Sequence, residues 1–209
     1  FLEENQLDIA SVKHRNVRSW MVTLIENGIS NKSVNRKLAC LRTFYKWLRK
    51  EGVIEINPIQ KIQGPKNEKR LPVFAKESEL KSERLQGVFS DDFEGKRDEL
   101  MFELFYQTGI RLSELIQLKD NDIADGRIKV LGKRNKERLI PISSTLTKKL
   151  QSFVHIKNKS LGDTPCLLVL KNGNKMYPAF VYRKINYYLS VVTSLDKKSP
   201  HVLRHTFAT

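Results

Sequence analysis

A polar segment bracketed by prolines divides this chain about a third of the way along. It runs Gly64-Pro65-Lys66-Asn67-Glu68-Lys69-Arg70-Leu71-Pro72 and carries charges in place of an apolar stripe. Such a composition is typical of a linker between domains. A chain of 209 residues suits one large domain or two small ones, and this segment favours two. The sequence predicts a first domain over residues 1–63, a linker over 64–72 and a second domain over 73–209.

Both sides of this segment are basic. The chain has 38 Lys+Arg against 23 Asp+Glu, a net charge of +15. Residues 1–70 hold 14 of these basic residues and 7 of the acidic ones, so the excess is shared between the two parts. This balance favours a long polyanion held from two sides. Two independently basic domains, or a basic protein without a polyanion partner, are the alternatives.

The cysteines and the chain ends bear on location. Cys40 and Cys166 lie among apolar residues, which predicts buried free thiols in a reducing compartment. No apolar run approaches the length of a membrane span, and no signal-peptide pattern follows Phe1. We therefore expect a protein of a reducing compartment, the cytoplasm, with no membrane partner. Because the first residue is not Met, the sequence also reads as trimmed at its ends.

Two amphipathic helices are predicted in the first domain. Apolar residues recur at helical spacing over residues 12–27 and again between Ser30 and Gly52. The face of the second helix away from its apolar stripe is basic, with no acidic residue among its cations. These cations are Lys32, Arg36, Lys37, Arg42, Lys46, Arg49 and Lys50. A solvated face is the simpler interpretation, but an uninterrupted basic stripe favours a phosphate-facing surface.

The second domain mixes helical spacing with alternation. Helices are predicted around residues 80–89, 97–108, 111–117, 145–156 and 180–192. Residues 128–130 and 139–142 alternate on either side of the turn Gly132–Glu137, which predicts a β-hairpin. Leu167 to Leu170 is a further short strand candidate. The predicted class is mainly α with a small antiparallel hairpin or sheet (α+β).

Arg111 follows a helix break at Gly109. It would lie near the start of a new helix, where free backbone N–H groups and the helix dipole favour anions. A guanidinium can donate two parallel hydrogen bonds to phosphate oxygens. Glu114, one turn later, can hold the arginine or a neighbouring histidine in place. An ordinary surface ion pair between Arg111 and Glu114 is the alternative.

Two further groups of basic residues could act with Arg111. Lys133 lies in the hairpin turn, where a flexible amine could protonate a leaving oxygen; Arg134 and Lys136 compete locally for that role. His201 and Arg204 are one turn apart on a helix opened by Pro200, which Ser199 could cap. An imidazole and a guanidinium on one face form a phosphate clamp with a titratable member.

Three blocks in this order resemble the tyrosine recombinase (phage-integrase-type) family, and most of all its Xer branch. The blocks are Thr108-Gly109-Ile110-Arg111-Leu112-Ser113-Glu114-Leu115, Gly-Lys-x-x-Lys-x-Arg from Gly132, and His-x-x-Arg from His201. Residues 31–48 also resemble the Xer core-binding segment. The resemblance covers nearly the whole chain and implies an N-terminal helical core-DNA-binding domain followed by a mixed catalytic domain.

The resemblance implies a site and a reaction. Arg111, Lys133, His201 and Arg204 match the catalytic set and Glu114 the supporting acid, with Lys133 as proton donor. DNA-binding roles fall on Lys32, Arg36, Lys37, Arg42, Lys46, Arg134 and Lys136. A tyrosine attacks the scissile phosphate, a 3′-phosphotyrosine forms and a 5′-hydroxyl leaves. No metal and no cofactor are expected, because the arginines stabilise the added negative charge.

The family's nucleophilic tyrosine follows the His-x-x-Arg motif. The tyrosines of this sequence all precede it: Tyr45, Tyr106, Tyr177, Tyr182, Tyr187 and Tyr188. We therefore expect the nucleophile beyond residue 209, and expect these 209 residues to bind DNA without cleaving it. The intact protein would be a site-specific recombinase that acts in chromosome dimer resolution, hence in chromosome partition and cell division, as a tetramer on two DNA sites.

Other functions fit the same residues. A mobile-element integrase would use the same catalytic set, and a non-catalytic DNA-binding regulator could have kept the fold. A type IB topoisomerase shares the chemistry and is a lesser alternative. A Gly-His-x-x-x-x-x-Thr block followed by a tyrosine would favour the enzyme over the regulator.

Overall fold

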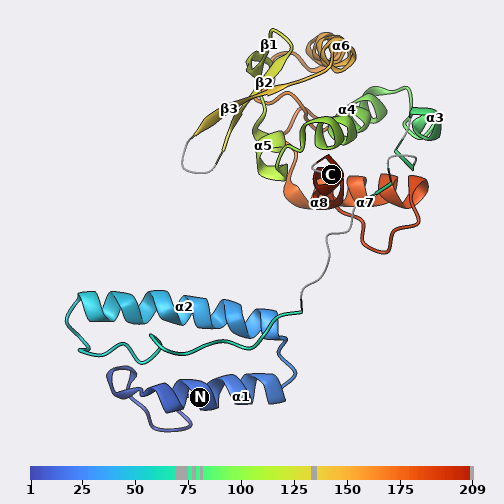
Figure 1. The fold of residues 1–209 in the computed structure, drawn as a ribbon. Helices are drawn as coiled ribbons and strands as arrows, with labels where there is room; N and C mark the ends of the chain where they lie inside the picture. Colours follow the sequence, from blue (N-terminus) through green and yellow to red (C-terminus); the bar gives the residue numbers. More distant parts are fainter. Residues whose placement is uncertain (69–74, 77–78, 81, 133–135, 208–209) are drawn as a thin grey trace. The chain divides into compact units, whose positions relative to one another are not determined.

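The computed structural model describes residues 1–68, 75–76, 79–80, 82–132 and 136–207. The chain forms two compact units, residues 1–70 and residues 71–209 (Figure 1). Their division falls inside the segment predicted as a linker. Two predicted site residues, Lys133 and Arg134, lie outside the described residues.

The first unit is a helical hairpin. A short 3₁₀ turn, η1 (Ile9–Ser11), precedes α1 (His14–Glu26) and α2 (Asn31–Lys50). Ser30 caps α2, since its hydroxyl accepts a hydrogen bond from the Ser33 N–H at 3.4 Å. The facing stripes bury Val17, Leu38, Tyr45 and Leu48. Both helices predicted for this region are confirmed to within two residues.

The chain after α2 packs back onto the same unit. Ile54, Ile59 and Ile62 enter its core, and Asn35 donates to the Pro65 carbonyl at 2.8 Å. At Gly64 a Cβ atom would lie 1.8 Å from the Asn35 side-chain oxygen, so only glycine allows this approach. The start of the predicted linker is therefore part of the first unit, because α2 supplies hydrogen bonds that sequence composition does not reveal.

The second unit combines helices with one small sheet. Its helical elements are α3 (Ser82–Leu85), α4 (Phe93–Thr108), α5 (Leu112–Gln117), η3 (Asp120–Asp122), α6 (Ser144–Leu161), α7 (Pro178–Val192) and α8 (Pro200–Phe207). Its strands β1 (Ile123–Ala124), β2 (Arg127–Leu131) and β3 (Glu137–Pro141) form an antiparallel sheet in the order β1-β2-β3. The predicted α+β class is confirmed, and the sheet has one short strand more than the predicted hairpin.

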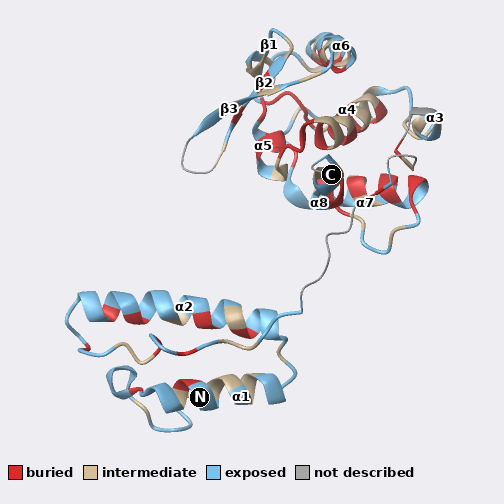
Figure 2. Cartoon of the chain, in the orientation of Figure 1, coloured by how far each residue is buried: buried red, intermediate tan, exposed pale blue. Residues whose placement is uncertain are grey.

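Helix α4 is the central element of this unit. Leu100, Met101, Phe102, Leu104 and Phe105 are all at most 3% exposed, so the helix is apolar on most of its circumference. Helices α6 and α8 both pack against it. Figure 2 shows buried residues along α4, α5 and the inner side of α7. The core therefore packs against the turn that joins α4 to α5.

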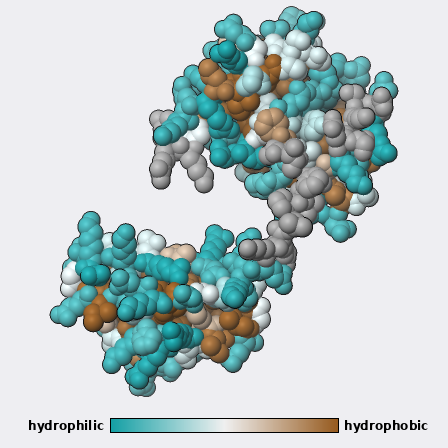
Figure 3. All heavy atoms as spheres, in the orientation of Figure 1, coloured by the Kyte–Doolittle hydropathy of each residue, from teal (hydrophilic) through white to brown (hydrophobic). Residues whose placement is uncertain are grey.

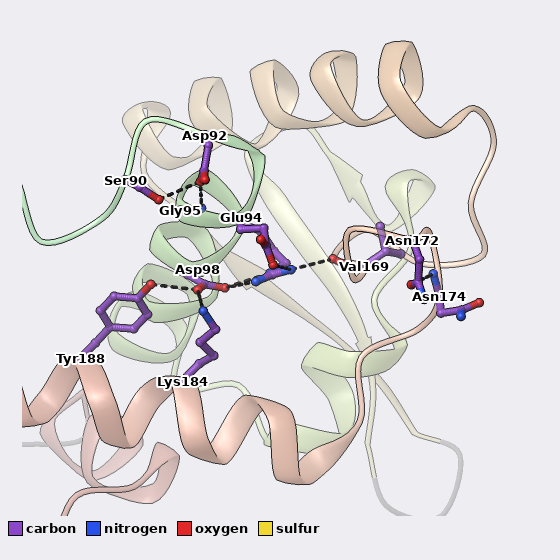
Figure 4. A network of polar contacts seen from close by, with 11 residues as sticks. Ser90, Asp92, Glu94, Gly95, Asp98, Val169, Asn172, Asn174, Lys184 and Tyr188 are labelled. Carbon is purple, nitrogen blue, oxygen red and sulfur yellow. Dashed lines mark hydrogen bonds and ion pairs between the residues drawn. The ribbon is translucent and has the colours of Figure 1, made fainter.

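Ionic groups are buried within this core (Figure 4). Asp98 of α4 accepts hydrogen bonds from Arg97 at 2.7 and 2.8 Å and from the Tyr188 hydroxyl at 2.8 Å. Lys184 of α7 lies 3.0 Å from the second Asp98 oxygen. Arg97 also donates to the Val169 carbonyl at 3.4 Å. The network links α4 to α7 and to the loop before it, and it raises the pKa of Tyr188 through burial and the charge of Asp98.

Three local predictions are wrong. Residues 167–170 form no strand but a single bridge, Val169 to Lys175, although Leu167, Leu168 and Val169 are buried; the apolar run marks burial alone. The helix predicted over residues 80–89 is one turn, α3. Cys40 is exposed, because the spacing of α2 turns it away from the stripe of Leu38 and Leu48, whereas Cys166 is buried as predicted.

Candidate active site

Arg111 and Glu114 form the start of α5. Arg111 is the N-cap residue, and its backbone N–H donates to Glu114 at 2.9 Å. The Arg111 guanidinium donates to the other oxygen of the same carboxylate at 2.8 Å. Glu114 is 7% exposed, whereas the Arg111 side chain is 42% exposed. This is not an ordinary surface pair, because the buried acid fixes a guanidinium that still faces solvent.

Arg138 of β3 joins this pair, although it was not among the site residues expected from the sequence. Its two terminal nitrogens donate to the two Glu114 oxygens at 2.8 and 2.7 Å. The bidentate form is the strongest that an arginine and a carboxylate can make. One signal could have found it: along β3, Arg138 shares the less exposed face with Ile140. An arginine at an inward strand position needs a buried partner.

These donors lower the pKa of Glu114 strongly. Burial alone would raise it, but hydrogen bonds from Arg138 and Arg111 outweigh burial and bring the pKa from 4.5 to about 2. Glu114 therefore stays ionised and keeps both guanidiniums in place over the whole physiological pH range.

Acid should weaken the second unit through Glu114. Its folded pKa is below the unfolded value, so the stability it contributes is present above pH 4.5 and is lost as pH falls toward 2. We expect about 2 kcal/mol of this contribution to disappear between pH 5 and pH 3. Urea unfolding at several pH values, followed by near-ultraviolet dichroism, measures it. The Glu114→Gln variant should lack this slope, and an equal slope in both proteins would contradict the assignment.

Arg204 reaches the same place from α8. Its guanidinium donates to the carbonyl of Gly109, two residues before Arg111. Burial lowers the pKa of Arg204, as do the positive charges of Arg111 and Arg138, while Glu114 opposes them. Three guanidinium groups therefore share the field of one carboxylate, and the site carries a positive excess.

Gly109 makes this meeting possible. It ends α4 in the left-handed region at φ 56°, where residues with side chains are strained. A Cβ atom at Gly109 would lie 2.6 Å from the Phe207 ring of α8. The Thr-Gly-x-Arg pattern thus serves two purposes: glycine turns the chain into α5 and lets α8 approach closely enough for Arg204 to bind the turn.

The other predicted residues are placed less fully. His201 is exposed on α8, one turn before Arg204, and Lys136 is exposed beside β3. Lys133 and Arg134 lie in the part of the hairpin that is not described. Ser199 does not cap α8: its hydroxyl is buried and has no hydrogen-bond partner among the described residues. Arg111, Glu114 and Arg204 are therefore brought together, while the position of Lys133 stays a prediction.

The basic face of α2 is exposed in the first unit. Lys32, Arg36, Lys37 and Lys46 are all exposed, and Figure 3 shows hydrophilic side chains over much of this unit's visible surface. Arg42 differs, because it donates to the Ile62 carbonyl at 2.7 Å and so helps to hold the chain after α2. A structural contact therefore already occupies part of its guanidinium.

Metal-ligand clusters and membrane-spanning helices are both absent from the described residues. No group of three or more His, Cys, Asp and Glu side chains could hold a metal ion there. None of the helices in the described ranges is long and apolar enough to span a membrane.

Known proteins match the chain along its whole length. The model of the phage integrase family matches residues 78–209, and that of the phage integrase N-terminal SAM-like domain matches residues 1–52. Tyrosine recombinase XerC of Staphylococcus epidermidis is 36% identical over 213 residues, covering 100% of this chain and 71% of that protein. Tyrosine recombinase XerC of Chlorobaculum tepidum is 34% identical, covering 99% of this chain and 69% of that protein.

Solved structures agree on the fold. The recombinase XerH, in a post-cleavage complex with its palindromic difH substrate, matches with a TM-score of 0.77 at 19% identity; the match covers 96% of this chain and 62% of that one. A lambda integrase dimer bound to a core site matches with a TM-score of 0.69 at 19% identity, over 96% of this chain and 57% of that one. On these matches, the chain belongs to the phage integrase family, that of the tyrosine recombinases.

Proposed function

We propose that this chain provides the DNA-holding and phosphate-activating parts of a site-specific recombinase of the Xer type. The observation that carries the proposal is the set of Arg111, Arg138 and Arg204 around the single carboxylate of Glu114. Three positive charges against one negative charge leave an excess suited to a phosphodiester. Attack on phosphorus adds a further negative charge, which such a preorganised site stabilises.

The reaction follows from the family assignment. A tyrosine hydroxyl attacks the scissile phosphorus, the bond to the 5′ oxygen breaks, and the leaving oxygen takes a proton. Arg111 and Arg204 would hold the non-bridging oxygens, because guanidiniums remain charged and match phosphate geometry. We assign the proton to Lys133 from the hairpin motif, and a further phosphate contact to His201. The hydroxyl of a partner strand reverses the step and joins the new strands.

The DNA contacts would come from both units. The exposed cations Lys32, Arg36, Lys37 and Lys46 lie on one helix whose sequence carries no acid between them. Lys136, Arg134 and the free part of Arg42 are the further proposed contacts. Solved relatives are described as bound to DNA and, for lambda integrase, as a dimer. We propose double-stranded DNA as partner, tetramer assembly on two sites, and a cytoplasmic location at the nucleoid.

The Xer role is favoured over the alternatives by the similarity itself. The XerC relatives share 34–36% identity over essentially the whole chain. Solved structures do not separate the two roles, because XerH and lambda integrase both share the fold at 19% identity and the Tn1549 integrase shares it at 22%; the preference rests on the XerC relatives. Chromosome dimer resolution is therefore proposed ahead of mobile-element integration.

A covalent adduct tests the enzymatic proposal. A polypeptide that contains these residues and the family's nucleophilic tyrosine is incubated with a nicked suicide duplex. After cleavage, the short fragment that carries the 5′-hydroxyl diffuses away. We expect a protein–DNA species that survives denaturation, forms without divalent metal and carries the DNA 3′ phosphate on tyrosine. The 209-residue chain is expected to bind the duplex without forming it. Binding without an adduct in both proteins would favour the non-catalytic regulator.

A further inference from the structure

Among the described residues, an ion pair joins the β2–β3 hairpin to α5, beside the apolar packing of Ile128 and Val130 into the core that also holds Leu115. Arg138 of β3 and Glu114 of α5 are 24 positions apart in sequence and share two hydrogen bonds, of 2.8 and 2.7 Å. The Glu114 side chain is 4% exposed, so the pair sits at the boundary of the core. In the same hairpin, Lys129 and Glu137 are 3.7 Å apart with both side chains about half exposed. The two pairs differ in burial and geometry, and only the first joins the hairpin to another element.

The turn of the hairpin begins against this pair. Gly132 donates its N–H to the Lys136 carbonyl at 2.8 Å. A Cβ atom at Gly132 would lie 3.3 Å from a terminal nitrogen of Arg138 and 3.9 Å from a Glu114 oxygen. The next residue in sequence is Lys133. Gly132, the last described residue before Lys133, therefore lies directly beside the bond between Arg138 and Glu114.

We propose that Arg138 is a positioning residue for the reaction. Its bidentate bond to Glu114 fixes the base of the hairpin against the helix start that carries Arg111. Through this bond, protonation of the leaving oxygen depends on Arg138, a residue that does not donate the proton itself. This inference rests on the proposed function, and it adds a residue that acts through others without contacting DNA.

The geometry distinguishes this role from direct phosphate binding. Both terminal nitrogens of Arg138 donate to Glu114, and this bonding raises the Arg138 pKa despite partial burial. The forked end of the guanidinium, which is the end that would pair with a phosphate, already faces the Glu114 carboxylate, and three of its five N–H groups point elsewhere. Lysine could keep the charge but not the two parallel bonds, because its ammonium is a point donor. The role therefore depends on the fork shape of the side chain, and Arg138→Lys isolates it.

Single-turnover cleavage on two substrates tests the proposal. One duplex has an ordinary scissile phosphate, and the other has sulfur in place of the bridging 5′ oxygen, so its leaving thiolate needs no protonation. The polypeptide with the nucleophilic tyrosine is compared with its Arg138→Lys, Arg138→Gln and Lys129→Gln variants. We expect both Arg138 variants to cleave the ordinary duplex roughly 10- to 100-fold more slowly, within the range of general-acid effects. On the sulfur substrate they should approach the parent rate.

The remaining outcomes decide against the proposal. Equal loss of the cleavage rate on both substrates would show that Arg138 acts on the phosphate or on folding. An unchanged rate in Arg138→Lys would show that the forked guanidinium is not required. Lys129→Gln should match the parent throughout, and DNA affinity should stay within about twofold in all variants.

Hydrogen exchange of the 209-residue chain gives a reading without DNA. Amides of residues 127–141 should exchange faster in Arg138→Lys and Arg138→Gln than in Lys129→Gln. If the Arg138 and Lys129 variants exchange alike, the fastening role is refuted. If the hairpin amides respond but the parent cleaves neither duplex, the proposed function fails while the structural fastening stands.

Discussion

Replacing Arg204 with alanine is expected to slow DNA cleavage by about 10²–10³-fold, the usual effect of losing one preorganised donor to a developing negative charge. Arg204 lies at the α4–α5 turn, where its guanidinium binds the Gly109 carbonyl within the field of Arg111 and Arg138. Its binding to a neutral carbonyl leaves its charge uncompensated by a direct carboxylate partner. That charge is therefore available to the phosphate, and the loss should appear in the cleavage step.

Binding and cleavage have to be measured separately. DNA affinity should change by no more than a few-fold, because the chain carries 38 Lys+Arg and the loss of one changes the total attraction little. Single-turnover adduct formation at saturating protein gives the cleavage rate, and a mobility-shift titration gives the affinity. Arg204→Lys should recover only part of the rate, because lysine keeps the charge but not the planar donors.

A matched surface arginine is the control for this prediction. Arg183 on α7 is exposed and donates to the Tyr177 hydroxyl at 2.9 Å, so Arg183→Ala removes an arginine with no link to Glu114. It should cleave at the parent rate. Cleavage by Arg204→Ala within a few-fold of the parent, or a loss of affinity as large as the loss of rate, would contradict the assignment of Arg204 to the reacting phosphate.

Much of this site could be predicted because its parts are local. Arg111 and Glu114 lie one turn apart on one helix, so spacing alone brings them together. His201 and Arg204 share a helix for the same reason. What spacing could not show is why the turn between α4 and α5 needs Gly109: the reason is Phe207, almost a hundred residues later. The order of the motifs implied that Gly109 and the helix of Phe207 lie together. That implication came from the resemblance to the family and not from a physical argument.

The missed features depend on tertiary contacts. Arg138 looked like one more cation in a basic hairpin, and only the register of β3 against β2 turns it toward Glu114. The run Leu167 to Leu170 has the composition of a strand, but with no partner strand beside it the run packs as a buried loop. The hydrophobic pattern of a sequence predicts which residues are buried. It predicts less reliably which backbone hydrogen bonds those residues make.

Replacing Asp98 with asparagine is expected to destabilise the second unit by about 3–5 kcal/mol, the usual cost of leaving a buried charge without its partner. Arg97 is fully buried, and Asp98 receives two of its hydrogen bonds (Figure 4). The neutral amide keeps the size of the side chain but cannot balance the guanidinium. It also weakens the bonds to Tyr188 and Lys184 that join α4 to α7.

The two units allow this loss to be localised within one sample. Trp20 and Trp47, the only tryptophans of the chain, both lie in residues 1–70, so tryptophan fluorescence follows the first unit. Five of the six tyrosines, including Tyr188, lie in residues 71–209, so near-ultraviolet dichroism in the tyrosine band, compared with the tryptophan fluorescence, follows the second unit. In urea, Asp98→Asn should move the tyrosine transition to lower concentration and leave the tryptophan transition in place. Lys96→Met, which breaks an exposed pair between α4 and Asp91 just before it, should cost no more than about 1 kcal/mol.

A double replacement shows whether the two buried charges themselves stabilise the second unit. Arg97→Met combined with Asp98→Leu removes both buried charges, so neither is left without a partner. Apolar replacements of whole buried ion pairs are often neutral, and we expect this variant to be more stable than Asp98→Asn although it carries more changes. If it is equally unstable or worse, the contribution of Asp98 comes mainly from its bonds to Tyr188 and Lys184. A loss below about 1 kcal/mol in Asp98→Asn would instead show that Glu94, 3.6 Å from Arg97, is sufficient to balance the guanidinium.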